Sequence, residues 1–297
     1  MAWASKHVAT VLRQRLRTAR VITFDATNTL YKLRRGVGEL YRDAATAHGI
    51  DAALLPSAED LKESFKESLK LQRARYPNYF FKAVDLGTGA SGRQIDATGY
   101  EWEGEYIPEE WWRMLLERTW DGAFYLRDEH TRLTALHGDR DALIDQLNGE
   151  DFFRALYHDF FCSDAAWEVL PGAVDAVARL ARWRDRCFDG AFDVCRVDTH
   201  GTETTMRSLS SRAEAEAVVA EFDAKRHKQG YFVRERPARR LGVLSNNDER
   251  LPRVLDALGL KQPFDFVLPS VEARAQKPDE LAFATAWANA GAGTPGG

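Results

Sequence analysis

The sequence has little of what defines several common protein classes. It contains three cysteines, with no Cys-x-x-Cys spacing and no cluster of cysteine and histidine. A disulfide framework or a zinc site is therefore not expected, and a reducing compartment is favoured. No apolar run approaches the roughly 18 residues that a membrane span requires. The formal net charge is -4, which gives no basic field for nucleic acid. We predict a protein that binds neither nucleic acid nor a membrane.

What the sequence does contain is typical of an α/β protein. The chain has 297 residues, of which 44% are hydrophobic and 29% charged, enough for one large domain or two ordinary ones. Apolar, strand-like runs lie at residues 21–24, 241–244 and 264–268, and helical patterns come after them. This alternation favours a parallel sheet. Residues 36–163 show helical periodicity and a Gly-rich loop near 83–104, which predicts an all-helical segment inserted into the α/β domain.

The predicted α/β domain therefore consists of residues 21–35 and 164–297. Within it, residues 186–237 do not fit a simple βα alternation, and we interpret them as an atypical insertion. Its Thr/Ser-rich stretch at 200–211 is interpreted as a loop. Residues 1–20 are basic and amphipathic and contain no acidic residue. They predict either a helix beside the first strand of a cytoplasmic protein, or a transit peptide for a mitochondrion or plastid.

The main chemical signal follows the first strand. Asp25 comes directly after the apolar run Val21–Phe24, and a Thr/Asn-rich turn follows it. Ligands of open parallel sheets sit at the carboxyl ends of the strands. A carboxylate in that place can attack phosphorus or carbon, hold a cation, or cap a turn.

Two later strands contribute to the same edge of the predicted sheet. Ser245 ends the strand at 241–244, and Lys277 follows the loop after the strand at 264–268. In phosphoryl transfer a carboxylate attacks phosphorus, a hydroxyl and backbone N–H groups hold the equatorial oxygens, and an ammonium group neutralises their charge. We therefore predict that Asp25, Ser245 and Lys277 meet at one crevice.

These motifs resemble those of the haloacid dehalogenase-like (HAD) superfamily. The stretch Asp25–Leu30 is similar to its first motif, D-x-D-x-T-L; Leu241–Asn246 to its second; and Lys277–Asp279 to its third. The helical segment lies where the superfamily places its cap. The resemblance implies a Rossmann-like parallel-sheet core with an inserted helical cap, and a phosphatase-type hydrolase that works through an aspartyl-phosphate.

The resemblance also assigns roles to individual residues. It implies that Asp25 and Lys277 are catalytic, that Asp25 ligates Mg²⁺, and that a small phosphorylated molecule is the ligand. The phosphate-binding residues it implies are Thr29, Ser245, Asn246 and Lys277. It identifies no protein partner.

The sequence departs from the family pattern in two places. Thr27 occupies the position of the second aspartate, the general acid and base of the phosphatases, and a threonine hydroxyl does not exchange protons near neutral pH as a carboxylate does. The fourth motif, whose acids help to hold Mg²⁺, is not found, so we expect a C-terminally truncated core and an incomplete metal site. Three alternatives stay open: a non-catalytic HAD-fold protein that binds phosphate or a protein, a fragment of a longer hydrolase, and a dehalogenase.

Overall fold

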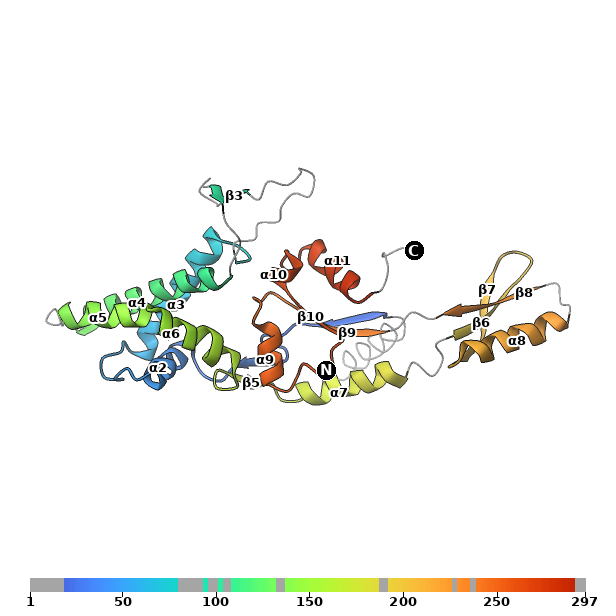
Figure 1. The fold of residues 1–297 in the computed structure, drawn as a ribbon, viewed down its shortest axis with the longest axis horizontal. Helices are drawn as coiled ribbons and strands as arrows, with labels where there is room; N and C mark the ends of the chain where they lie inside the picture. The colour runs from blue at the N-terminus through green and yellow to red at the C-terminus, as the bar shows by residue number, and fades with distance from the viewer. Residues whose placement is uncertain are drawn as a thin grey trace, which may run out of the picture.

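The computed structural model describes residues 19–79, 93–95, 101–103, 108–131, 137–186, 192–225, 229–235 and 239–291. These residues form three lobes in a row: a helical lobe, a central parallel sheet with its helices, and a small lobe of three strands and a helix (Figure 1). Most of the basic segment 1–20 and the Gly-rich run 87–92 lie outside the described residues. No helix in the described part of the chain is both long and apolar enough to cross a membrane.

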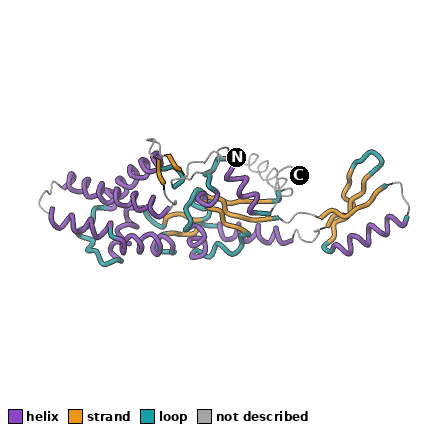
Figure 2. The backbone as a smooth tube through the Cα atoms, turned by 45° about the horizontal axis from the view of Figure 1, so that its top comes forward, coloured by secondary structure: helices purple, strands orange, loops and turns teal. Residues whose placement is uncertain are grey.

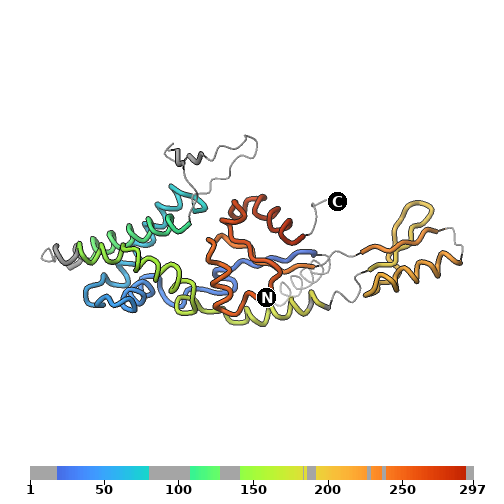
Figure 3. The backbone as a smooth tube through the Cα atoms, viewed as in Figure 1, coloured from blue at the N-terminus to red at the C-terminus, as the bar shows by residue number. Residues whose placement is uncertain are grey.

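The central sheet contains the three strands that the apolar runs predict. Its order is β1-β9-β10 and all pairs are parallel. Segments far apart in the sequence, β1 and β9, therefore lie side by side (Figure 3). The fold class of a mixed α/β protein with a parallel sheet is confirmed. The strands are β1 (Val21–Phe24), β9 (Arg240–Ser245) and β10 (Phe266–Pro269).

Both faces of this sheet are covered, because successive residues of β9 point to opposite sides. Val243 packs into a cluster with α7 and α9, whereas Leu244 packs into a second cluster with α10 and α11. Figure 1 shows α10 and α11 on one side of the sheet and α7 on the other. The helices are α7 (Ala173–Arg186), α9 (Leu251–Ala257), α10 (Ser270–Ala273) and α11 (Glu280–Asn289).

The helical lobe has its own apolar core, in which Tyr41, Leu61 and Trp120 are almost fully buried. Ser57 caps α3 by accepting a hydrogen bond from the Asp60 N–H. The helices are α2 (Val37–Ala47), α3 (Ala58–Arg75), α4 (Pro108–Thr131), α5 (His137–Asn148) and α6 (Glu150–Arg154). A π-helical turn (Ala155–Asp159) and a 3₁₀ turn (Phe160–Cys162) continue α6.

The expectation of an all-helical segment with a plain loop at 83–104 is wrong. Two short strands, β3 (Arg93–Ile95) and β4 (Glu101–Glu103), pair there as an antiparallel hairpin. At the base of the lobe, β2 (Tyr31–Leu33) pairs with β5 (Trp167–Val169). Each of these strands has three residues, too few to show a period-2 pattern, and β2 pairs with a segment more than 130 residues away.

The third lobe lies at the other end of the molecule, beyond the central sheet (Figure 2). Its antiparallel sheet has the order β7-β6-β8, and α8 packs on it through a stacked pair, Phe222 on Tyr231. Phe192 and Glu235, the first and last residues of these strands, pair with each other, so the chain enters and leaves the lobe at one point. The elements are β6 (Phe192–Val197), β7 (Glu203–Leu209), α8 (Arg212–Ala224) and β8 (Gly230–Glu235).

The prediction of a loop over 200–211 is therefore wrong, because β7 spans most of that stretch. Residues 203–207 are exposed, as an edge strand permits, since one edge and one face of such a strand meet water. Thr and Ser on an exposed edge give no alternating apolar signal. This is why the composition resembles that of a loop.

Candidate active site

Asp25, Ser245 and Lys277 meet at the carboxyl edge of the central sheet. Asp25 follows β1 directly, Ser245 is the last residue of β9, and Lys277 lies in the loop before α11. The Ser245 hydroxyl donates a hydrogen bond to Asp25 Oδ1 at 2.7 Å, and the Lys277 ammonium donates to the same oxygen at 2.8 Å. The Ala26 N–H in turn donates to Ser245 Oγ at 3.3 Å. Three segments that are remote in sequence thus supply an acid, a hydroxyl and an amine to one place.

The electrostatics of this group keep Asp25 ionised. Partial burial raises the pKa of a carboxyl group, but the hydrogen bonds from Lys277 and Ser245 and the charge of Lys277 outweigh it and hold the pKa of Asp25 below its usual value. The Asp25 side chain is 44% exposed and therefore accessible. An accessible carboxylate that stays charged at neutral pH is suited to nucleophilic attack.

Asn246 positions Lys277. Its amide nitrogen donates to the Lys277 carbonyl at 3.0 Å, and its amide oxygen accepts from the Lys277 N–H at 2.7 Å. Both ends of this side chain therefore hold the backbone of Lys277. The sequence predicts Asn246 as a phosphate-binding residue, whereas its contacts are those of a residue that orients the ammonium group.

Thr29 lies in the turn that follows Asp25. The turn is closed by hydrogen bonds from the Thr29 and Leu30 N–H groups to the Ala26 carbonyl, and Asn28 adopts a left-handed conformation. Thr29 is exposed, and within the described residues no hydrogen bond joins its hydroxyl to the three converging side chains. Its contact with a phosphate group stays a prediction.

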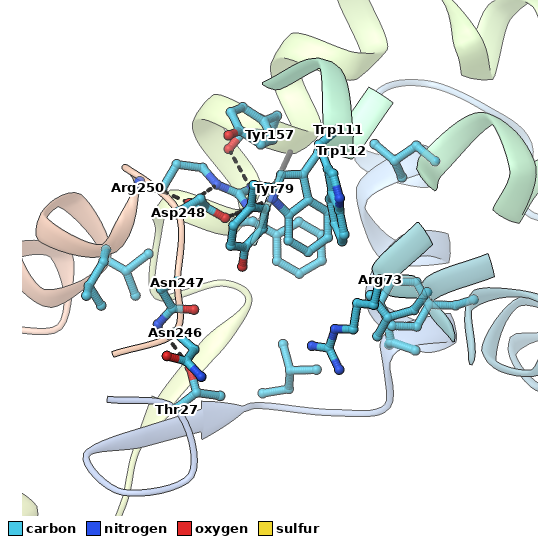
Figure 4. A pocket seen from close by; sticks show the side chains of 18 of the residues that line it. Thr27, Arg73, Tyr79, Trp111, Trp112, Tyr157, Asn246, Asn247, Asp248 and Arg250 are labelled. Atoms are coloured by element: carbon cyan, nitrogen blue, oxygen red, sulfur yellow. Dashed lines mark hydrogen bonds and ion pairs between the residues drawn. The ribbon is translucent and has the colours of Figure 1, made fainter. Parts of the chain in front are cut away.

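A cavity of about 530 Å³ opens between the sheet edge and the helical lobe. From the sheet side it is lined by Thr27, Asn246 and Gln276, which are close neighbours in sequence of the three converging residues. From the helical lobe it is lined by Trp111, Trp112 and Tyr157, among others (Figure 4). Asp25 therefore lies at the margin of a cavity with aromatic walls.

Some bulky aromatic residues of the helical lobe serve packing alone, such as Trp120 and Phe152, which are fully buried in its core. Trp111 and Tyr157 are equally buried but also line the cavity.

A buried ion pair joins the helical lobe to the sheet behind this cavity. The Arg250 guanidinium donates to Asp248 at 2.7 and 2.9 Å, and Trp112 Nε1 donates to the same carboxylate at 2.8 Å. Arg250 also stacks on the Tyr157 ring, 3.8 Å from its centroid, and the Tyr157 hydroxyl donates to Glu249 at 2.6 Å. Burial raises the pKa of Asp248, but Arg250 and its hydrogen bonds lower it by more.

Comparison with known proteins finds similarity in sequence to several of them. No protein-family model matches the chain. The haloacid dehalogenase-like hydrolase domain-containing protein 3 of Bos taurus is 27% identical over 264 residues, which is 89% of this chain and 66% of the relative. The chain is therefore similar to proteins named as haloacid dehalogenase-like hydrolases. The human protein of the same name is 26% identical over the same shares of both chains.

Two further proteins are similar to the chain at lower sequence identity. The Rhythmically expressed gene 2 protein of Drosophila melanogaster is 24% identical over 92% of this chain and 70% of its own length. Among solved structures, an L-2-haloacid dehalogenase from Xanthobacter autotrophicus with chloropropionic acid covalently bound has a TM-score of 0.38 at 13% identity, covering 91% of this chain and 64% of that one. The chain spans about two thirds of the length of the curated relatives named "domain-containing protein 3".

The donor set at Asp25 does not fit the Mg²⁺ site that the HAD resemblance implies. Within the described ranges, no three His, Cys, Asp or Glu side chains are grouped so that they could hold a metal ion. Mg²⁺ usually takes one or two protein carboxylates in a near-octahedral shell. Asp25 Oδ1 already accepts two hydrogen bonds, and Asp248 is paired with Arg250.

Proposed function

We propose that this HAD-like protein hydrolyses a small phosphate monoester through an aspartyl-phosphate at Asp25. The observation that carries the proposal is the convergence of Lys277 and Ser245 on one oxygen of an ionised, accessible Asp25. The helical lobe would act as the cap that shields the reaction from water. The proposal rests on chemistry that the described residues supply themselves.

In the first step a carboxylate oxygen of Asp25 forms a bond to phosphorus, and the bond from phosphorus to the ester oxygen breaks. The electron pair leaves with that oxygen. Lys277 partly offsets the repulsion between the carboxylate and the phosphate, while Ser245 donates a hydrogen bond to Asp25 Oδ1. In the second step water adds to phosphorus, the Asp25–phosphorus bond breaks, and inorganic phosphate is released together with a proton.

Thr27 determines which esters react. It cannot protonate the leaving oxygen, and such help is typically worth about 10²–10⁴-fold in rate. Aryl phosphates, whose phenolate leaves without protonation, should therefore react much faster than alkyl phosphates. Because Thr27 also cannot activate water as a base, the aspartyl-phosphate should accumulate.

The test is a burst experiment with p-nitrophenyl phosphate, with and without Mg²⁺, and with direct detection of phosphorylated Asp25. We expect rapid release of close to one equivalent of p-nitrophenolate per chain, followed by slow turnover. Asp25→Asn should abolish both phases. Asp256→Asn, which neutralises an exposed aspartate on α9, is the matched control and should behave as wild type. A burst that persists in Asp25→Asn would remove Asp25 from the mechanism.

A second candidate is a non-catalytic protein that binds phosphate at the same place, and Thr27 is the specific observation that favours it. In that case no nitrophenolate is released, while inorganic phosphate raises the melting temperature of the wild type but not of Lys277→Met. Attack on carbon would instead appear as Asp25-dependent release of chloride from 2-chloropropionate.

A further inference from the structure

The cavity beside Asp25 carries information about the ligand because its aromatic walls offer mainly carbon surface. Three of the polar groups on these walls are already paired: Trp111 Nε1 donates to the Tyr76 carbonyl at 2.9 Å, and Trp112 Nε1 donates to Asp248. The Tyr157 hydroxyl donates to Glu249. Since their hydrogen-bonding capacity is used elsewhere, these side chains favour a flat, apolar body.

The cavity also has the size of a small-molecule site. Its volume of about 530 Å³ lies within the range of roughly 300–1,000 Å³ that is typical of ligand pockets. Trp111 and Trp112 pack edge to face, 5.2 Å between centroids, and Tyr79 packs on Trp111 at 4.9 Å. This mutual packing fixes the walls in advance, so that a ring can stack on them without ordering them first.

One charged side chain of the lining has no ion-pair or hydrogen-bond partner among the residues that the structure describes. Arg73, in the last turn of α3, lines the cavity and forms no ion pair or hydrogen bond with any other described residue. Figure 4 shows its guanidinium group directed into the cavity, from the side opposite Asp248 and Arg250. Arg250 differs from it, because its guanidinium is fully engaged with Asp248. Arg73 is therefore the lining cation that is available to a ligand.

The two ends of the cavity thus differ in chemistry. Thr27, two residues after Asp25, lies on one side, and Arg73 lies across from it (Figure 4). We propose that the substrate is an aryl phosphate that carries a carboxylate: Asp25 receives the phosphoryl group, the aromatic walls hold the ring, and Arg73 pairs with the carboxylate. This inference rests on the proposed function for the phosphoryl end alone.

The experiment compares 4-carboxyphenyl phosphate with phenyl phosphate. For the wild type we expect a kcat/KM about tenfold or more higher with the carboxylated ester, the size of one charge-assisted, bidentate contact. Arg73→Gln should remove this preference and leave the kcat/KM for phenyl phosphate within about twofold of wild type. Arg75→Gln, which changes an exposed arginine of the same helical turn that does not line the cavity, should keep the preference.

A binding measurement separates this inference from the proposed function. The non-hydrolysable 4-carboxybenzylphosphonate is titrated by calorimetry into wild type, Arg73→Gln and Arg75→Gln. If the phosphonate binds to wild type and not to Arg73→Gln, but neither ester is hydrolysed, the ligand class is supported and the hydrolase proposal fails. The opposite outcome is that both esters are hydrolysed with equal kcat/KM, that this hydrolysis depends on Asp25, and that Arg73→Gln does not change it. This result overturns the ligand class, while the hydrolase proposal stands. Equal binding to wild type and Arg73→Gln also overturns it.

Discussion

Asn246 does not contact Asp25, yet its contacts fix how Lys277 meets that carboxylate. Two hydrogen bonds join its side-chain amide to the backbone of Lys277, one at 2.7 Å and one at 3.0 Å. Asn246→Ala removes both, so we expect the burst rate to fall about tenfold, since a small misplacement of a catalytic group is costly. Because the weaker Lys277 contact lets the pKa of Asp25 rise, the acid limb of the pH–rate profile should move to higher pH.

The matched control is Asn289→Ala, which removes an exposed amide whose one described contact is within α11. Its burst rate and pH profile should equal those of wild type. An Asn246→Ala protein with a lower rate but an unchanged acid limb would show that Asn246 does not act through Lys277.

The lowered pKa of Asp25 also links folding to pH. A carboxyl group whose pKa is lower in the folded than in the unfolded chain stabilises the fold above the unfolded value, about 3.9, and this contribution is lost as pH falls through the folded value. Asp25→Asn should therefore lower the melting temperature at pH 7, and the difference from wild type should shrink toward pH 3. Thermal scans across this range test it, with Asp256→Asn as the control that stays close to wild type throughout.

The buried pair of Asp248 and Arg250 contributes more to the free energy of unfolding than Asp25 does, and this contribution is independent of any reaction. The Asp248 side chain is 7% exposed and that of Arg250 is 11% exposed. Asp248→Asn leaves a buried guanidinium without its counter-charge, and such a change typically costs about 3–5 kcal/mol. We expect a loss of that size in the free energy of unfolding, measured by urea titration.

The comparison variant for that measurement is Asp185→Asn, because Asp185 pairs with Arg184 and its own side chain is 61% exposed. Its loss should stay below about 1 kcal/mol. Equal losses in the two variants would contradict the role assigned to burial.

At the scale of elements, a side chain of β10 covers one glycine of β9 so closely that an added Cβ atom would clash with it. A Cβ atom at Gly242 would lie 2.2 Å from the ring of Phe266, the residue paired with it on β10. Gly242→Ala should therefore lower the free energy of unfolding by about 1–3 kcal/mol, the usual cost of overpacking. The double variant Gly242→Ala/Phe266→Leu should recover part of this loss in urea titrations, and an additive loss would argue against the contact.

Elements with strong local patterns can be predicted from the sequence, and elements defined by their partners cannot. β1 and β9 are apolar runs, and α3 begins with a capping box formed by Ser57 and Asp60, so local chemistry identifies these elements. β2 and β7 are short or polar, and their status depends on pairing with other segments.

The residues of the candidate site also differ in whether the sequence alone predicts their arrangement. The convergence of Asp25 and Lys277 follows from strand ends in a parallel sheet. The clamp by Asn246 and the pair of Asp248 with Arg250 depend on loop geometry and on contact with the helical lobe. The available guanidinium of Arg73 also becomes visible only when the lobe is placed over the sheet edge.

At the scale of the whole molecule, the β6–β8 lobe lies beyond the end of the central sheet opposite the helical lobe (Figure 1). Since Phe192 pairs with Glu235, replacing residues 192–235 by a short Gly/Ser link joins two ends that are already neighbours. We expect the shortened protein to unfold cooperatively and to keep its p-nitrophenyl phosphate burst within about twofold. Circular dichroism and the burst assay measure this, and aggregation or loss of the burst would show that the lobe supports the site.

The parallel pairing of β1 with β9 has a consequence for synthesis on the ribosome. Val21 pairs with Arg240, so the first strand leaves the exit tunnel more than 200 residues before its neighbour. At about 5–20 residues per second, that interval lasts on the order of ten seconds or more. The helices in between can pack on one another as they emerge, whereas β1 remains without its sheet partner until β9 has been synthesised.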